Sequence, residues 1–240
     1  MLEDQIRPLA GKTELVILPE MFNTGFCLEP DLLAEEMDGP TVGWMKKLAA
    51  DCRIILTGSL IIREDGHYFN RLIWMLPNGQ YGWYDKRHRF AFAGEDRQFT
   101  AGTKRLIAAV KGWRVNLQVC YDLRFPVWAR QTLQNEEPEF DLLIYVANWP
   151  ERRSHAWKTL LQARAIENQC YVAGVNRVGN DGNGIYHKGD SMVIDPLGTV
   201  LKQQQETAGV FSIEIDKKTL AAVREKMPFW KDADQFNLLP

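Results

Sequence analysis

One short stretch of the sequence constrains the fold most. Residues 117–126 read Leu-Gln-Val-Cys-Tyr-Asp-Leu-Arg-Phe-Pro, so an apolar run delivers Cys120 into a polar turn and a proline stops the element. The run 113–119 predicts a buried strand, and a helix is predicted from Asp122 to about Leu133. The positive end of a helix lowers the pKa of a thiol, and its free backbone N–H groups can hold an oxyanion. Cys120 is therefore the candidate nucleophile, and the alternative is an inert core thiol.

Other apolar runs of strand length also end next to polar residues. The run 14–18 precedes Glu20, and the run 80–84 precedes Lys86. Asn148 follows a third run that is rich in β-forming residues. Ligands bind at the carboxyl ends of strands in open α/β sheets, so these residues are candidates for one shared site. Taken singly, each charge could equally be a solvated loop residue.

The pattern of strands and helices indicates an α/β fold. Apolar residues recur at helical spacing in 41–51 and in 154–169, where Ser154 is a possible cap. Hairpin turns interrupt the alternation, and the alternating residues 210–215 predict a further strand with one solvated face. A mixed sheet system covered by helices fits this pattern better than a purely parallel sheet. No linker or fixed repeat divides the chain, which favours one domain.

Charge and cysteine usage exclude several classes of protein. The 29 basic and 31 acidic residues give a formal charge of −2, so no footprint for nucleic acid or an anionic membrane is present. No apolar run approaches the ~20 residues that span a bilayer, and the first residues lack the pattern of a secretion signal, so the cytoplasm is the expected location. The four cysteines form no C-x-x-C pair for zinc or redox exchange, and reduced thiols are expected.

Three motifs resemble those of the nitrilase superfamily of carbon-nitrogen hydrolases. Residues 18–22, Leu-Pro-Glu-Met-Phe, are similar to its glutamate motif, and residues 84–88, Tyr-Asp-Lys-Arg-His, to its lysine motif. Residues 119–125, Val-Cys-Tyr-Asp-Leu-Arg-Phe, are similar to its cysteine motif, and Glu95 matches a second glutamate that many members carry. The resemblance continues in three further stretches, 145–150, 163–169 and 189–191.

The resemblance implies a fold and an assembly. Members form a four-layer α-β-β-α sandwich and commonly pair into homodimers through the helices that cover the sheets. They usually carry one more strand, at the start of the chain and inside the core sheet, whereas this chain begins in what resembles the helix after it. We therefore expect residues 1–240 to form a single carbon-nitrogen hydrolase domain that is short at its N-terminus, with an exposed sheet edge.

The resemblance also implies an activity. The motifs are most similar to those of bacterial omega-amidases, which hydrolyse the terminal amide of 2-oxoglutaramate or 2-oxosuccinamate to a 2-oxo acid and ammonia. The expected partner is thus a small-molecule amide, and no metal or organic cofactor is required. Two alternatives remain open: a related enzyme acting on another small amide, an N-carbamoyl compound or a nitrile, or a catalytically impaired binding subunit.

Four catalytic side chains and one backbone N–H follow from the resemblance and from the chemistry of amide hydrolysis. Glu20 is expected to act as the base, and Cys120 to form a thioester. Lys86 and the backbone N–H of Tyr121 are expected to stabilise the oxyanion, and Glu95 to orient Lys86. His88 is a less favoured base, because a lone histidine in a basic loop is usually a packing residue.

Recognition of a substrate carboxylate calls for an arginine or equivalent donors. Arg124, Arg152 and Arg153 lie nearest in sequence to the catalytic turns, although Arg124 could instead pair with an acidic residue. Aromatic residues near the motifs could form apolar walls. The predicted substrate-binding residues are Phe22, Phe92, Arg124, Asn148, Trp149 and Arg152.

Overall fold

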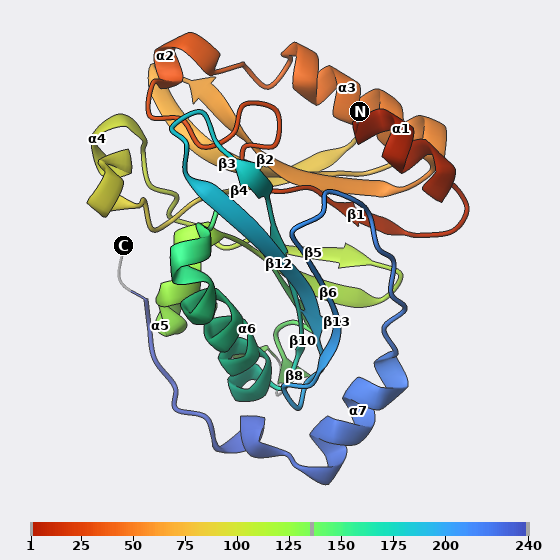
Figure 1. The fold of residues 1–240 in the computed structure, drawn as a ribbon. Coiled ribbons are helices and arrows are strands. Elements are labelled where there is room, and N and C mark those ends of the chain that lie inside the picture. The colour runs from red at the N-terminus through yellow and green to blue at the C-terminus, as the bar shows by residue number, and fades with distance from the viewer. Residues whose placement is uncertain (1, 135–136, 239–240) are drawn as a thin grey trace.

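Two β-sheets lie face to face at the centre of the computed structural model, which describes residues 2–134 and 137–238. Helices cover the outer face of each sheet, so four layers stack in the order α-β-β-α (Figure 1). The predicted fold class is confirmed. None of the helices in the described part of the chain is long and apolar enough to cross a membrane.

The first sheet is built from the N-terminal part of the chain. β1 runs parallel to β2, whereas β2, β3 and β4 follow one another antiparallel. In spatial order the strands are β1 (Leu15–Ile17), β2 (Ile55–Glu64), β3 (His67–Met75) and β4 (Tyr81–Asp85). The helices on this side are α1 (Leu2–Ile6), η1 (Arg7–Leu9), α2 (Pro30–Leu33) and α3 (Pro40–Cys52) (Figure 1).

The second sheet carries three parallel strands at its centre. β6, β9 and β10 run in the same direction, so their carboxyl ends meet at one edge, as the sequence predicted. The strands are β11 (Val178–Asn180), β12 (Tyr186–Ile194), β10 (Tyr171–Asn176), β9 (Leu142–Ala147), β6 (Trp113–Val119) and β5 (Ile107–Val110), with β13 (Val200–Gln205) beside β12. A small separate ribbon joins β7 (Leu133–Gln134) to β8 (Glu137–Pro138).

The rest of the chain contributes short helices and one long helix. They are η2 (Ala91–Ala93), α4 (Glu95–Gln98), η3 (Cys120–Arg124), α5 (Pro126–Ala129), η4 (Glu151–Arg153), α6 (Ser154–Asn168), α7 (Lys217–Lys226) and η5 (Phe229–Asp232). The single helix predicted after Asp122 is wrong, because Phe125 leaves the helical region before Pro126 and divides the segment in two. Ser154 begins α6 as predicted, but its hydroxyl bonds to Asp190 and does not cap the helix.

Three apolar clusters fill the spaces between the four layers. Met45 and Leu48 of α3 pack against the first sheet, and Trp157 and Leu161 of α6 pack against the second. Along β9, alternate residues face the space between the sheets and the space under α6. A strand that is buried on both faces reads as a continuous apolar run, which is why residues 140–147 lack a polar alternation.

β1 forms an edge of the first sheet, because it pairs with β2 alone. The predicted strand at 210–215 is wrong: the segment is irregular in the structure and pairs with no strand. Its alternation is nevertheless real, since Phe211, Ile213 and Ile215 pack against the core between the sheets. A groove of about 540 Å³ is lined by both β1 and this segment.

Candidate active site

The predicted catalytic residues come together where strands of both sheets end. Glu20 follows β1 and Lys86 follows β4, while Cys120 follows β6 of the opposite sheet. Lys86 and Cys120 line one cavity of about 620 Å³, whereas Glu20 and Glu95 are not part of its lining and contact Lys86 from within the protein. Residues more than sixty positions apart in the sequence therefore meet at a single site.

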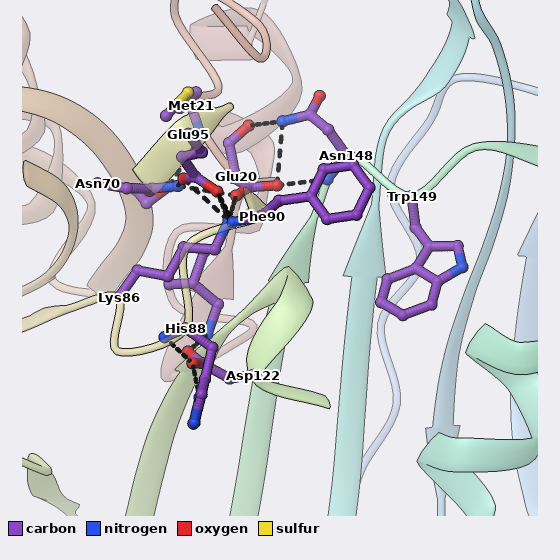
Figure 2. Close-up of polar contacts among 12 residues, drawn as sticks. Glu20, Met21, Asn70, Lys86, His88, Phe90, Glu95, Asp122, Asn148 and Trp149 are labelled. Atoms are coloured by element: carbon purple, nitrogen blue, oxygen red, sulfur yellow. Dashed lines mark hydrogen bonds and ion pairs between the residues drawn. The ribbon is translucent and has the colours of Figure 1, made fainter. Parts of the chain in front are cut away.

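Lys86 lies between the two carboxylates (Figure 2). Its Nζ donates to Glu20 Oε1 at 2.9 Å, to Glu95 Oε2 at 2.8 Å and to Glu95 Oε1 at 3.0 Å. All three side chains are at most 1% exposed. Burial lowers the pKa of Lys86, but Glu20 and Glu95 outweigh it and raise that pKa above its ordinary value, so Lys86 is a fixed cation.

Backbone and amide donors hold Glu20 in its ionised form. The Asn148 N–H donates to Oε2 at 2.8 Å, and Asn70 Nδ2 donates to Oε1 at 2.8 Å. Burial raises the pKa of Glu20, but Lys86 and these donors overcome it and bring the pKa below its ordinary value. Asn148 also donates from Nδ2 to the Glu20 carbonyl at 2.7 Å, which fixes the turn after β1. The carboxylate is thus an available proton acceptor at neutral pH.

Glu95 is held by a separate set of contacts. The Phe90 N–H donates to its Oε2 at 2.5 Å, and Asn70 Nδ2 reaches its Oε1 at 3.3 Å (Figure 2). Asn70 therefore bridges both carboxylates, although it lies in the middle of β3. Sequence reasoning missed Asn70, and the available signal was a polar pair, Asn70 and Arg71, before the apolar end of the strand.

Cys120 has a left-handed backbone with φ of 46°. This conformation is costly for a residue with a side chain and persists only where the surroundings enforce it. Asp122 provides the restraint: it is fully buried and accepts from the Val119 N–H at 3.0 Å and from the Tyr84 hydroxyl at 2.8 Å. Since Tyr121 lies in the first turn of η3, its N–H has no acceptor within the helix and is free to face a ligand.

His88 supports the same turn. Its N–H and its Nδ1 both contact Asp122 Oδ1, at 2.9 and 2.8 Å, and its ring stacks on Phe125 at 3.9 Å between centroids. It does not line the cavity. The expectation that His88 is a packing residue agrees with this position, and the role of Asp122 behind the nucleophile was missed from the sequence.

The thiol itself differs from the prediction. Burial, together with the nearby Glu20 and Glu95 carboxylates, raises the pKa of Cys120 well above its ordinary value, and Lys86 only partly opposes them. The expected lowering by a helix end is therefore wrong, because only a short 3₁₀ turn begins at Cys120 and two carboxylates lie close to it. Cys120 is thus held as a neutral thiol close to the ionised Glu20 carboxylate.

The predicted substrate-binding residues line the cavity with one exception. Phe22 lies elsewhere, and this prediction is wrong: its ring packs against Trp44 of α3, with centroids 5.9 Å apart. Phe92 is at the mouth and is 83% exposed. Phe90 was missed from the sequence. The lining shared with the prediction comprises Phe92, Arg124, Asn148, Trp149 and Arg152.

The fold and the buried cluster together are those of an enzyme that cleaves carbon-nitrogen bonds. A profile of the family described as carbon-nitrogen hydrolase matches residues 5–225, and the chain belongs to this family. The omega-amidase YafV of Escherichia coli K12 is 43% identical over 235 residues, which are 98% of this chain and 89% of the relative. The 2-oxoglutaramate amidase of Bacillus subtilis 168 is 34% identical over 222 residues, or 91% and 84% of the two chains.

A solved structure shows the same architecture. XC1258 from Xanthomonas campestris is described as a CN-hydrolase superfamily protein with an arsenic adduct in the active site. Its crystal structure is 48% identical in sequence to this chain and superimposes with a TM-score of 0.97. The match covers 99% of this chain and 91% of that one.

Proposed function

We propose that this protein is an omega-amidase that hydrolyses the terminal amide of 2-oxoglutaramate or 2-oxosuccinamate. The products are a 2-oxo dicarboxylic acid and ammonia. The observation that carries the proposal is the buried cluster of Glu20, Lys86 and Glu95 beside Cys120, at the base of a cavity whose rim is rich in arginine. The named activities of the E. coli and B. subtilis relatives support the substrate class.

Acylation begins with the neutral thiol. Glu20 removes the Cys120 proton as sulfur attacks the amide carbon, so no thiolate has to persist in the resting enzyme. The oxygen of the tetrahedral intermediate is stabilised by the Lys86 ammonium and the Tyr121 N–H. Glu20 then returns the proton to the departing nitrogen, the C–N bond breaks, and ammonia leaves a thioester on Cys120.

Deacylation uses the same groups in reverse. Glu20 takes a proton from a water molecule, and the resulting hydroxide attacks the thioester carbon. Lys86 and the Tyr121 N–H again hold the oxyanion, and Glu20 restores the proton to the departing Cys120 sulfur. Glu95 keeps Lys86 in place and offsets its charge, since it contacts Nζ with both oxygens.

Three wider features belong to the same proposal. Residues 1–240 form one carbon-nitrogen hydrolase domain, the enzyme is a homodimer, and it acts in the cytoplasm. The family profile over 5–225 supports the first. Sedimentation analysis tests the homodimer, because a monomer at micromolar concentration excludes it. Fractionation of cells tests the cytoplasmic location.

The test of the activity is ammonia release from a panel of substrates. The panel contains 2-oxoglutaramate, 2-oxosuccinamate, an N-carbamoyl amino acid and a small aliphatic nitrile. The two 2-oxo amides should give the highest kcat/KM, and this turnover should vanish in Cys120→Ala but not in Cys52→Ala, whose thiol lies in α3 away from the cavity. Preference for the nitrile or the N-carbamoyl compound contradicts the proposed substrate.

A further inference from the structure

The rim of the catalytic cavity has a surplus of positive charge. Four arginines line it, and none of their guanidinium groups forms an ion pair with a described residue: Arg124, Arg152, Arg153 and Arg177. The acidic residues of the lining, Glu29 and Asp181, are too few to balance the four arginines and Lys86. A cavity with this charge distribution attracts an anionic ligand.

The guanidinium groups of Arg177 and Arg124 contact neutral groups of the protein. Arg177 Nη2 donates to the Asn180 carbonyl at 3.1 Å, and its Nη1 reaches Asn148 Oδ1 at 3.5 Å. Arg124 is exposed and lies over the Trp149 ring, 4.9 Å from its centroid. Arg152 is also exposed and points to no partner among the described residues.

Arg153 differs from the others because it is half-buried and fixed while its donors are free. The Trp149 indole donates to its carbonyl at 2.9 Å and holds its backbone. Its guanidinium lies over the Phe90 ring at 5.1 Å, and Phe90 packs edge-on against Tyr121 at 5.0 Å. The guanidinium has no hydrogen bond to any described residue, so its donors remain available to a ligand one aromatic ring away from the nucleophile turn.

We infer that Arg153 is the residue that binds the substrate carboxylate, an inference that rests on the proposed omega-amidase function. A guanidinium binds a carboxylate through two parallel N–H bonds, which fixes both the position and the orientation of the anion. In 2-oxoglutaramate the carboxylate lies at the opposite end of the molecule from the amide. Binding at Arg153 therefore holds the amide over Cys120 and Lys86, and the apolar substrate chain lies along Phe90.

The electrostatics of the rim agree with this geometry. Burial lowers the pKa of Arg153, and the neighbouring Arg152 and Arg124 lower it further. Arginine stays protonated in proteins despite such effects, so Arg153 is a cation that is partly removed from water and repelled by its neighbours. A bound carboxylate relieves it, whereas a neutral amide does not.

The experiment measures kcat and KM of Arg153→Met on 2-oxoglutaramate and on butanamide, a neutral amide. Loss of a charge-assisted bidentate contact should lower kcat/KM for 2-oxoglutaramate roughly 100-fold, mainly through KM, and leave butanamide unchanged. Arg153→Lys should lower the same kcat/KM about tenfold, because lysine keeps the charge but cannot donate two parallel N–H bonds. The control is Arg53→Met, an exposed arginine at the end of α3 that does not line the cavity.

Three results overturn the inference. One is equal loss on both amides, which indicates a structural role. Another is a carboxylate-specific loss in Arg124→Met or Arg152→Met with none in Arg153→Met. The third comes from an assay without turnover, which measures whether 2-oxoglutarate protects the Cys120 thiol from iodoacetamide. Protection is expected in the wild type and in Arg53→Met but not in Arg153→Met. Absence of protection in the wild type, or protection that persists in Arg153→Met, excludes the site.

Failure of the proposed function is distinguishable from failure of this inference. If the wild-type enzyme does not hydrolyse 2-oxoglutaramate, the omega-amidase proposal falls. Arg153 as an anion-binding residue is then decided by the protection assay alone. If Arg153→Met does not fold, Arg153→Lys is compared with Arg53→Met in both assays.

Discussion

The floor and the rim of the catalytic cavity use charge in opposite ways. At the floor, Lys86 contacts two carboxylates and all three groups are buried. At the rim, the half-buried Arg153 has no anionic partner among the described residues. The charges of the floor are paired before substrate arrives, whereas the guanidinium of Arg153 at the rim is not. In the proposed function the floor performs the chemistry, and the inference for Arg153 gives the rim the selection of the ligand.

Burial explains why the floor must be complete. Removing one partner from a buried ion pair leaves an uncompensated charge, which typically costs about 3–5 kcal/mol. In the proposed mechanism Glu20 therefore exchanges protons with the Cys120 thiol, the substrate nitrogen and water, while Lys86 and Glu95 keep their charges. The exposed part of the rim has no such constraint, because water screens its arginines.

The largest predicted effect is at the nucleophile. Cys120→Ala should lower ammonia release about 10⁴-fold or more, because no other described residue of the floor can form a thioester. Steady-state kinetics measure the loss, and unchanged far-UV circular dichroism shows that the fold is retained. Activity within tenfold of the wild type would contradict the claim that the floor is catalytic and that the rim only selects the ligand.

The next effect is at the base. Glu20→Gln should lower kcat about 10³-fold, since the amide cannot accept the thiol proton. The same change removes a negative charge that raises the pKa of Cys120 while Lys86 stays in place. Alkylation of Cys120 by iodoacetamide should therefore begin at lower pH than in the wild type, even though turnover is lost. An alkylation profile that moves to higher pH contradicts the assigned charges.

A smaller effect is expected behind the nucleophile. In Asp122→Asn, an amide group would face the N–H and hydroxyl donors of Val119, Tyr84 and His88, which now bond to a carboxylate. The lost contacts should cost about 1–3 kcal/mol of unfolding free energy. Loosening of the Cys120 turn should lower kcat roughly 10- to 100-fold with little change in KM. Urea titration and kinetics measure both, and a change in KM alone assigns Asp122 to binding.

The pH dependence follows from the direction of the Glu20 shift. Lys86 and the amide donors bring the pKa of Glu20 below its ordinary value of 4.5, so the base stays ionised down to that pH. The stability that these contacts provide is present above the unfolded pKa and is lost as pH falls through the folded one. We expect kcat/KM to stay level from neutral pH down to 4.5 and to fall only below it, once the pH passes the lowered pKa of Glu20. A decline that starts near pH 6 contradicts the paired floor.

The smallest predicted effect is at the exposed part of the rim. Arg124→Met should change kcat/KM for 2-oxoglutaramate by less than about fivefold, since exposed charges contribute little to binding. The same assay that measures Arg153→Met measures this variant. A loss of kcat/KM comparable to that of Arg153→Met would mean that the exposed arginines also bind the substrate carboxylate.

Local patterns, together with the resemblance in three motifs, predicted which residues meet at the floor of the cavity. Glu20, Lys86 and Cys120 each follow an apolar strand, and strand ends in an α/β fold lie near one another. The four layers follow from the same runs and from the helical spacing in α3 and α6. The irregular segment 210–215 shows the limit of this reasoning, because alternation predicts which residues are buried but not whether a partner strand is beside them.

Features that depend on distant contacts could not be predicted. The raised pKa of Cys120 results from carboxylates that are remote in sequence, and Asn70 reaches both of them from the middle of a strand. Phe22 is the last residue of the glutamate motif, yet the turn after Glu20 directs its ring toward α3. Sequence proximity to a motif was also a poor guide among the arginines, since only the structure separates Arg153 from Arg152.

The central claim is that an amide is cleaved at the floor through a thioester on Cys120. Rapid quenching after mixing the enzyme with saturating 2-oxoglutaramate, followed by mass spectrometry of its peptides, tests this claim most directly. The account predicts an acyl adduct on the peptide that carries Cys120, formed together with the first ammonia released, and neither in Cys120→Ala. An adduct on a different residue, or undiminished ammonia release by Cys120→Ala, would contradict it.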